Sequence, residues 1–234
     1  MNKQKLTAVF GGLAAAGYVL RRLVYAGAVD EKNLIVSGHP FLIILWAVTV
    51  AALALAAFSG WKQEDKKLFE GCFCASSPAF WGHGMLGVGI LLTVCLNPVP
   101  MLGLVGMLWK FLGLAAPVCL LIAGFGRMQG KRPFFALYIV PCLFFAIHVV
   151  AHYQIWCSNP QFTDYAFALL GSVALSLFSY QLSAFCADTG SCRRLHLWGL
   201  AAVYLCGAEI PMSAYPYLFF GGILFALTAL PDQA

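Results

Sequence analysis

Charged residues are scarce in this chain. Lys, Arg, Asp and Glu together make up 10% of the 234 residues, whereas soluble domains carry about 25%. Hydrophobic residues make up 62%, and the mean hydropathy is +0.84. A water-soluble fold of this length could not bury so much apolar surface, and a disordered chain would show the opposite composition. The composition therefore excludes both classes and predicts that lipid is the solvent for most of the chain.

The motifs of several catalytic sites are also missing. The sequence contains no Walker A loop, no GxSxG motif and no HExxH motif, so an ATPase, a serine hydrolase or a zinc protease is not predicted. The triplet DTG at residues 188–190 matches that of aspartic proteases, but it falls in a predicted loop of a helical protein, and we treat it as coincidence. No cofactor is predicted.

What the chain does contain is a series of long apolar runs. Crossing about 30 Å of hydrocarbon takes about 17–25 helical residues, and eight runs approach that length. They cover residues 6–28, 39–59, 79–96, 101–125, 134–156, 165–187, 195–210 and 214–230. The last two are short, and Pro211 and Pro216 favour a tight hairpin there, with a re-entrant seventh segment as the alternative. We predict an all-α, polytopic transmembrane helical bundle of about eight spans, formed by residues 1–234 as a single integral membrane domain.

The basic residues indicate the orientation of these spans. Ten of the 14 fall at the start of the chain or in the connections after even-numbered spans, and three fall in the opposite connections. The ten are Lys3, Lys5, Lys62, Lys66, Lys67, Arg127, Lys131, Arg132, Arg193 and Arg194. Cytoplasmic loops carry the excess of Lys and Arg, so both termini of this multi-pass protein are predicted to be cytoplasmic. This placement also accounts for the net charge of +5 without a nucleic-acid partner.

The first run resembles a signal peptide, because small residues follow it at 26–28. Arg21 and Arg22 stand between the apolar stretch and those residues, where a cleavable signal is normally uncharged. A retained first helix is therefore expected.

Two histidines lie four residues apart in the outer third of the fifth run. His148 and His152 share one helix face, and such a pair can chelate a metal. The run reads HVVAH, however, so it lacks the glutamate of HExxH, and a haem would need a further ligand such as His39 or His83. They are weak metal candidates. Two alternatives stay open for these histidines. They could pack structurally within the bundle, or they could handle a substrate or a proton near the outer face.

Four other ionisable residues complete a candidate site. Lys110 lies in the fourth run, and Glu209 stands beside Pro211. Arg21 and Arg22 lie near the outer interface, where a guanidinium could bind a carboxylate or phosphate, or pair with Asp30, Glu31 or Glu209. Because intramembrane charges usually face a cavity or a partner, we predict an outward-facing polar cavity formed by Arg21, Arg22, Lys110, His148, His152 and Glu209.

Seven of the nine cysteines divide between the two sides, and Cys119 and Cys142 fall in the middle of predicted spans. Cys72, Cys74, Cys186 and Cys192 are predicted to face the reducing interior, where stable disulfides are not expected. With His83 and His196 they are weak candidates for a metal site, because their spacing matches no standard ligand pair. Cys95, Cys157 and Cys206 lie toward the outside and leave room for one disulfide.

The basic start and the segment RRLVYAGAVDEKNLIVSGHP (21–40) resemble uncharacterised small polytopic membrane proteins of Firmicute-type bacteria. This resemblance covers about 20 residues and implies a bacterial plasma membrane, with no particular activity. Three functions stay open. The first is a permease or solute-binding membrane component, whose partners would be the bilayer and a small solute or lipid headgroup. The others are an accessory or scaffold protein of a larger complex, whose protein partner is unknown, and a membrane-embedded redox or metal-dependent enzyme using His148 and His152.

Overall fold

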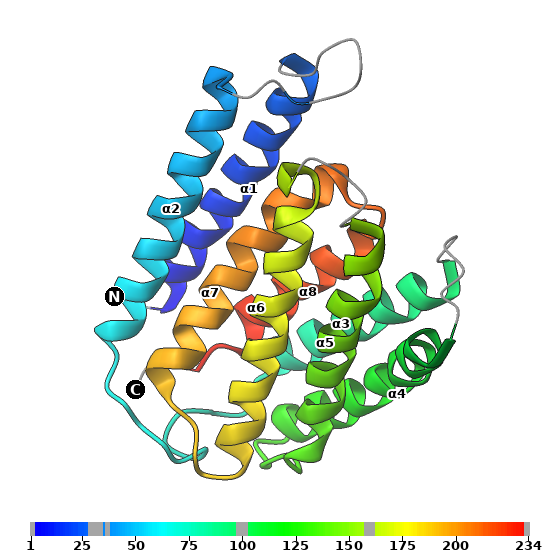
Figure 1. The fold of residues 1–234 in the computed structure, drawn as a ribbon. Coiled ribbons are helices and arrows are strands. Elements are labelled where there is room, and N and C mark those ends of the chain that lie inside the picture. The colour runs from blue at the N-terminus through cyan, green and yellow to red at the C-terminus, as the bar shows by residue number, and fades with distance from the viewer. Residues whose placement is uncertain (1–2, 28–34, 36–37, 97–102, 157–161, 232–234) are drawn as a thin grey trace.

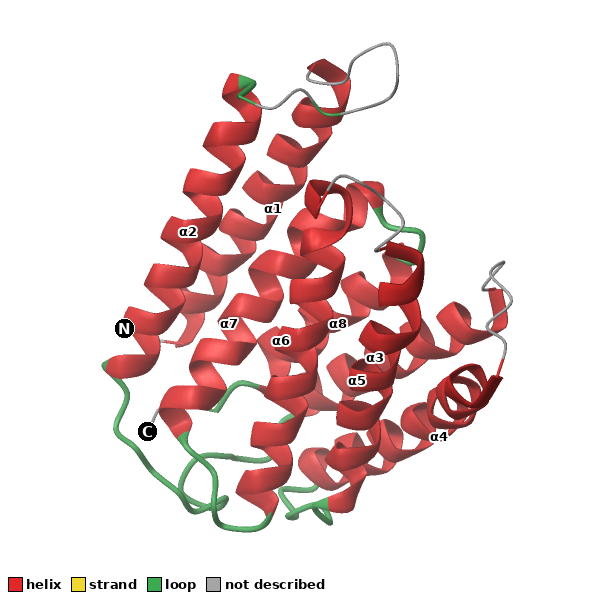
Figure 2. Cartoon of the chain, in the orientation of Figure 1, coloured by secondary structure: helices red, strands yellow, loops and turns green. Residues whose placement is uncertain are grey.

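The computed structural model describes residues 3–27, 35, 38–96, 103–156 and 162–231, and in this part of the chain it is helical and contains no strand (Figures 1 and 2). Its α-helices are α1 (Lys3–Gly27), α2 (Pro40–Trp61), α3 (Ser77–Leu96), α4 (Gly103–Met128), α5 (Ala136–Trp156), α6 (Phe162–Cys186), α7 (Cys192–Glu209) and α8 (Pro216–Ala229), with a short 3-10 helix, η1 (Ile210–Met212), between the last two. Among the described residues seven helices are long and apolar enough to cross a membrane, while α8 has 14 residues. The predicted helical membrane bundle is confirmed.

Helix α7 lies at the centre of the bundle. It packs against α1, α2, α6 and α8, and most of its residues are buried. The remaining helices continue around it, because α3 contacts both α8 and α4, α4 contacts α5, and α5 contacts α6. Helices α1 and α2 form a pair on one side of α7 (Figure 1). The central position lets α7 carry buried polar residues such as His196 and Glu209 away from lipid.

The connection between α7 and α8 is a sharp turn. Pro211 lies within η1, and Pro216 is the first residue of α8, so neither residue can donate a helical backbone hydrogen bond. The helix therefore breaks after Glu209, and α8 returns alongside α7. The structure confirms the expected hairpin over a continuous helix.

Glycines permit the closest helix contacts. A Cβ on Gly221 of α8 would lie 2.7 Å from the carbonyl oxygen of Met85 in α3, and one on Gly207 of α7 would lie 2.6 Å from Cβ of Ala14 in α1. Any larger side chain at these positions would push the helices apart. Small residues at interfaces are the usual means of packing helices closely in membranes.

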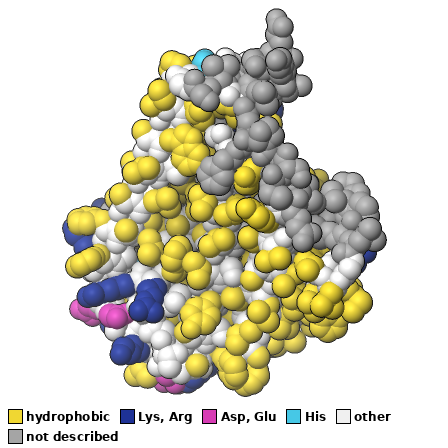
Figure 3. Space-filling view, viewed as in Figure 1, with side chains coloured by type: hydrophobic (Ala, Val, Ile, Leu, Met, Phe, Trp, Pro, Cys, Tyr) yellow, Lys and Arg dark blue, Asp and Glu magenta, His cyan; other side chains and the backbone are white. Residues whose placement is uncertain are grey.

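The two ends of the bundle differ in charge. At one end the connections 62–76, 129–135 and 187–191 touch one another, through hydrogen bonds such as those of Ser191 with Asp65 and of Arg132 with Asp188. We call this the basic end. Figure 3 shows charged side chains gathered at that end and a largely hydrophobic surface above it. Such a surface suits contact with lipid. The end that carries the α7–α8 turn is called the opposite end.

Candidate functional site

A buried ion pair joins α1 to the end of α7. Nη2 of Arg21 lies 3.1 Å from Oε2 of Glu209, and the two side chains are 1% and 4% exposed. The same Nη2 donates to the backbone oxygen of Asp164 at 2.8 Å, and the guanidinium lies over the ring of Phe167 at 4.7 Å. Glu209 is therefore the acid that neutralises Arg21. Asp30 and Glu31, the other acids considered from the sequence, lie outside the described residues.

This ion pair is not fully satisfied by hydrogen bonds. Nε and Nη1 of Arg21 are buried and have no acceptor among the described residues. A buried guanidinium retains its charge, and a buried charge is tolerated when it is paired and hydrogen-bonded. The arrangement thus leaves two donors of Arg21 available within the opposite end of the bundle.

Tyr25 connects this buried network to the protein surface. It lies one helical turn after Arg21, on the same face of α1, and its hydroxyl donates to Oδ1 of Asp164 at 2.7 Å. Asp164 itself stands in the first turn of α6. The network therefore connects α1, α6 and α7 through Arg21, Tyr25, Asp164 and Glu209.

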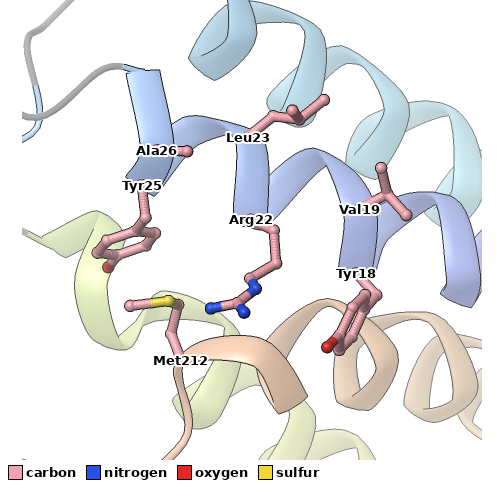
Figure 4. A pocket seen from close by; sticks show the side chains of 7 residues that line it. All are labelled: Tyr18, Val19, Arg22, Leu23, Tyr25, Ala26 and Met212. Carbon is pink, nitrogen blue, oxygen red and sulfur yellow. The ribbon is translucent and has the colours of Figure 1, made fainter.

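On its other side Tyr25 lines an open pocket. The pocket has a volume of about 520 Å³ and is lined by Tyr18, Val19, Arg22, Leu23, Tyr25, Ala26 and Met212. Figure 4 shows the guanidinium of Arg22 pointing from α1 toward the turn that carries Met212, between Tyr18 and Tyr25. Arg22 is exposed, and no acidic side chain of the described residues pairs with it. Within the described residues, the pocket therefore presents the positive charge of Arg22 between apolar and aromatic walls.

The two predicted histidines lie in a second buried cluster. Nε1 of Trp109 donates to Nδ1 of His148 at 3.1 Å, and the rings of His148 and His152 lie 4.0 Å apart. Nδ1 of His152 contacts the backbone oxygen of His148 at 2.9 Å, and Nε2 of His152 contacts the hydroxyl of Tyr215 at 3.2 Å. Both histidines are at most 3% exposed. They face the bundle interior and not the surrounding lipid.

The hydrogen bond from Trp109 decides the chemistry of His148. Because Nδ1 accepts the hydrogen bond donated by Trp109, the neutral ring carries its own proton on Nε2. That Nε2 is buried and has no acceptor among the described residues. A metal would need a lone pair at this atom, so the observed arrangement makes His148 a hydrogen-bond donor and does not favour the chelating pair considered from the sequence.

The single shared cavity predicted from the sequence is divided in the structure. Arg21 and Glu209 form the ion pair, His148 and His152 form the aromatic cluster, and Arg22 lines the open pocket. Lys110 does not join any of these groups, because its side chain is on an exposed face of α4 while the adjacent Trp109 points inward. Lys110 therefore faces out of the bundle.

Four residues of the site were missed from the sequence alone: Tyr25, Trp109, Asp164 and Tyr215. Tyr25 carried a signal, because it lies four residues after Arg21 and must share its helix face. Asp164 lies one residue before the predicted start of the sixth run at 165. Tyr215 carried none, since aromatic residues near span ends are common in any membrane protein. Trp109 carried none either, because nothing in an apolar run shows which of its aromatic residues points inward.

The other predicted ligands lie elsewhere. His83 contacts the backbone oxygen of Ala79 at 2.6 Å and the hydroxyl of Tyr138 at 2.9 Å, and His39 caps the start of α2. The described residues contain no group of three or more His, Cys, Asp or Glu placed to hold a metal. Cys95 and Cys206 are free thiols, one exposed and one buried, and Cys157 lies outside the described residues.

The fold and these clusters define a multi-pass α-helical membrane protein with two buried polar clusters and an open pocket at the opposite end. No family model, no curated protein and no solved structure matches the chain. The function must therefore be argued from the site itself.

Proposed function

We propose that this protein is a solute-binding component of the bacterial plasma membrane that holds an anionic amphiphile, such as a phospholipid with a net negative headgroup, in the pocket beside Arg22. The observation that carries this proposal is the contrast between two adjacent arginines. Arg21 is buried and neutralised by Glu209, whereas Arg22 keeps its charge in an open pocket. An arginine fork recognises carboxylate and phosphate groups through paired hydrogen bonds.

The walls of the pocket favour an amphiphile over a small hydrophilic anion. Val19, Leu23 and Met212 supply apolar surface, and Tyr18 and Tyr25 supply rings with one polar end each. Amphipathic aromatic rings are enriched where lipid headgroups meet hydrocarbon. Arg22 lies five residues before the end of α1, about 7.5 Å along the helix axis. This depth suits a headgroup whose acyl chains continue along the bundle.

The volume is also suited to binding. Small-molecule sites typically enclose about 300–1,000 Å³, and the pocket has about 520 Å³. The distribution of basic residues predicts that the opposite end faces away from the cytoplasm, so the ligand would come from the outer leaflet. The proposal therefore includes this orientation, with the pocket open to the outer leaflet.

Native mass spectrometry of the purified protein in detergent tests this function. The probes are phosphatidylglycerol, phosphatidylcholine with the same acyl chains, and inorganic phosphate. Phosphatidylglycerol should bind more tightly than phosphatidylcholine, and Arg22→Gln should weaken it. A hydrogen bond to a charged group contributes about 1.5–3 kcal/mol, so the loss should be about 10- to 100-fold.

Two variants serve as controls. Arg194→Gln removes an exposed arginine at the basic end and should leave phosphatidylglycerol binding unchanged. Arg22→Lys keeps the charge but loses the paired geometry, so it should bind with intermediate affinity. Equal binding of phosphatidylglycerol by Arg22→Gln and the unaltered protein would refute the proposal. Displacement of the lipid by inorganic phosphate would instead identify a free anion as the ligand.

A further inference from the structure

The connection 62–76 at the basic end is folded against the helices. Phe69, Cys72 and Phe73 of this loop are buried. The ring of Phe73 packs edge-on against Phe185 at the end of α6, at 5.2 Å between centroids, and Arg127 lies 4.0 Å above the same ring. The loop therefore forms a cap over the basic end, and it is held there by contacts from several helices.

Further hydrogen bonds tie this loop to the start of α7. Oγ of Ser191 donates to Asp65 at 2.7 Å, and Nε of Arg193 donates to the backbone oxygen of Gln63 at 3.1 Å. These two bonds flank the first residue of α7, Cys192. The loop and the helix start are thus held next to each other on both sides of one cysteine.

Two thiols meet at this junction. Sγ of Cys72 lies 3.1 Å from Sγ of Cys192, although 120 residues separate them in the sequence. Both are reduced and at most 6% exposed, but each adjoins an exposed residue, Gly71 in one case and Arg193 in the other. A disulfide needs a sulfur–sulfur distance of about 2.05 Å, so bonding requires an approach of about 1 Å. Cys72 lies in a non-helical loop that can move by this amount.

We propose that Cys72 and Cys192 are an oxidation site at which a hydroperoxide produces a reversible disulfide that locks the loop 62–76 onto α7. This proposal is independent of the function proposed for the opposite end. It rests on the distance between two thiols from separate elements and on the contacts that hold those elements together. It agrees with the expectation that no stable disulfide forms on this side, because the proposed disulfide is reversible.

The reaction proceeds in two steps. One thiolate attacks the peroxide oxygen, so that a sulfur–oxygen bond forms, the oxygen–oxygen bond breaks and water or an alcohol leaves. The second thiol then attacks the resulting sulfenic sulfur, which forms the disulfide and releases water. The two thiols give up two electrons to the peroxide, and their two protons end in the products. A dithiol reductant reverses the reaction by thiol–disulfide exchange.

The test uses the full chain purified under reducing conditions and then treated with hydrogen peroxide. Free thiols are blocked with N-ethylmaleimide, and the unreduced peptides are identified by mass spectrometry. We expect a peptide pair that joins Cys72 to Cys192, the loss of two free thiols for each chain, and their recovery with dithiothreitol. Cys72→Ser and Cys192→Ser should each abolish the cross-link.

Cys74→Ser is the matched control, because Cys74 is exposed and lies two residues from Cys72. It should leave the cross-link unchanged. A disulfide that uses Cys74 in place of Cys72, or oxidation of either buried thiol to sulfinic acid without cross-linking, would overturn the proposal.

A second measurement tests the locking of the loop without a variant. Trypsin should cut after Lys62, Lys66 and Lys67, which are exposed in the loop, several-fold more slowly in the oxidised protein than in the reduced protein. Equal rates of cleavage at these sites would refute the locking even if the disulfide forms. In intact cells the pair should be reduced during growth and oxidised after hydroperoxide is added, and a permanently oxidised pair would contradict a reversible site.

Discussion

Removing either partner of the ion pair between Arg21 and Glu209 should destabilise the protein far more than removing both. We consider Arg21→Met, Glu209→Leu and the double variant. Each single change leaves one charge buried without its counterion, whereas the double change leaves none. The three variants and the unaltered protein form a double-mutant cycle that isolates the interaction between the two side chains.

The structure sets the magnitude of this effect. At the observed distance of 3.1 Å, two unit charges attract by about 5 kcal/mol at an effective dielectric constant of about 20. Desolvation of both charges opposes this attraction by several kcal/mol. The intact pair is therefore close to neutral relative to an apolar replacement, while breaking it from one side costs about 3–5 kcal/mol.

Thermal unfolding in detergent is a suitable assay. A change of 1 kcal/mol shifts Tm by about 2–4 °C for a chain of this size, so each single variant should lose about 6–20 °C. The double variant should unfold closer to the unaltered protein than either single variant does. The ion pair of Arg132 with Asp188 is the control, because its side chains are 40% and 38% exposed and exposed pairs contribute about 0–1 kcal/mol.

Additive effects would refute the reasoning. If the two single changes in free energy sum to the double change within about 0.5 kcal/mol, Arg21 and Glu209 do not interact as described. A double variant less stable than both single variants would lead to the same conclusion.

Two further predictions concern packing. Gly221→Ala places a Cβ 2.7 Å from the carbonyl oxygen of Met85, so it should lower the free energy of unfolding by about 1–3 kcal/mol. Gly84→Ala is the control, because its Cβ would meet only the side chain of Leu121 at 3.8 Å, and it should leave stability unchanged. Equal Tm values for the two variants would contradict the close contact of α3 with α8. Lys110→Met should leave the free energy of unfolding unchanged within about 0.5 kcal/mol, because Lys110 lies on an exposed face. A loss of several degrees in Tm would show that Lys110 has a buried partner.

The spans could be predicted because hydrocarbon thickness fixes their length. The runs at 39–59 and 134–156 match α2 and α5 to within two residues at each end, and the prolines at 211 and 216 placed the last turn correctly. Span length and the proline turn depend on composition and on local backbone chemistry, and both can be read from one sequence. The orientation of the bundle in the membrane stays a prediction from the positive-inside pattern.

The rotation of each helix could not be predicted in the same way. Arg21 and Arg22 have the same chemistry and apolar neighbours, yet about 100° of helix rotation puts one inside the bundle and the other in an open pocket. The same rotation separates buried Trp109 from exposed Lys110. Helix α4 is apolar around most of its circumference, so hydrophobicity alone does not mark the face that contacts other helices.

The turn between α7 and α8 contributes to all three groups at the opposite end. Within seven residues it supplies Glu209 to the ion pair, Met212 to the pocket and Tyr215 to the histidine cluster. Its backbone is constrained by two prolines, so a shift of the turn would move these side chains together. A ligand that favours one position of Met212 must then also favour one geometry of the contact between Tyr215 and His152. By thermodynamic reciprocity, the hydrogen-bonding state of His152 must change the affinity of the pocket by the same factor.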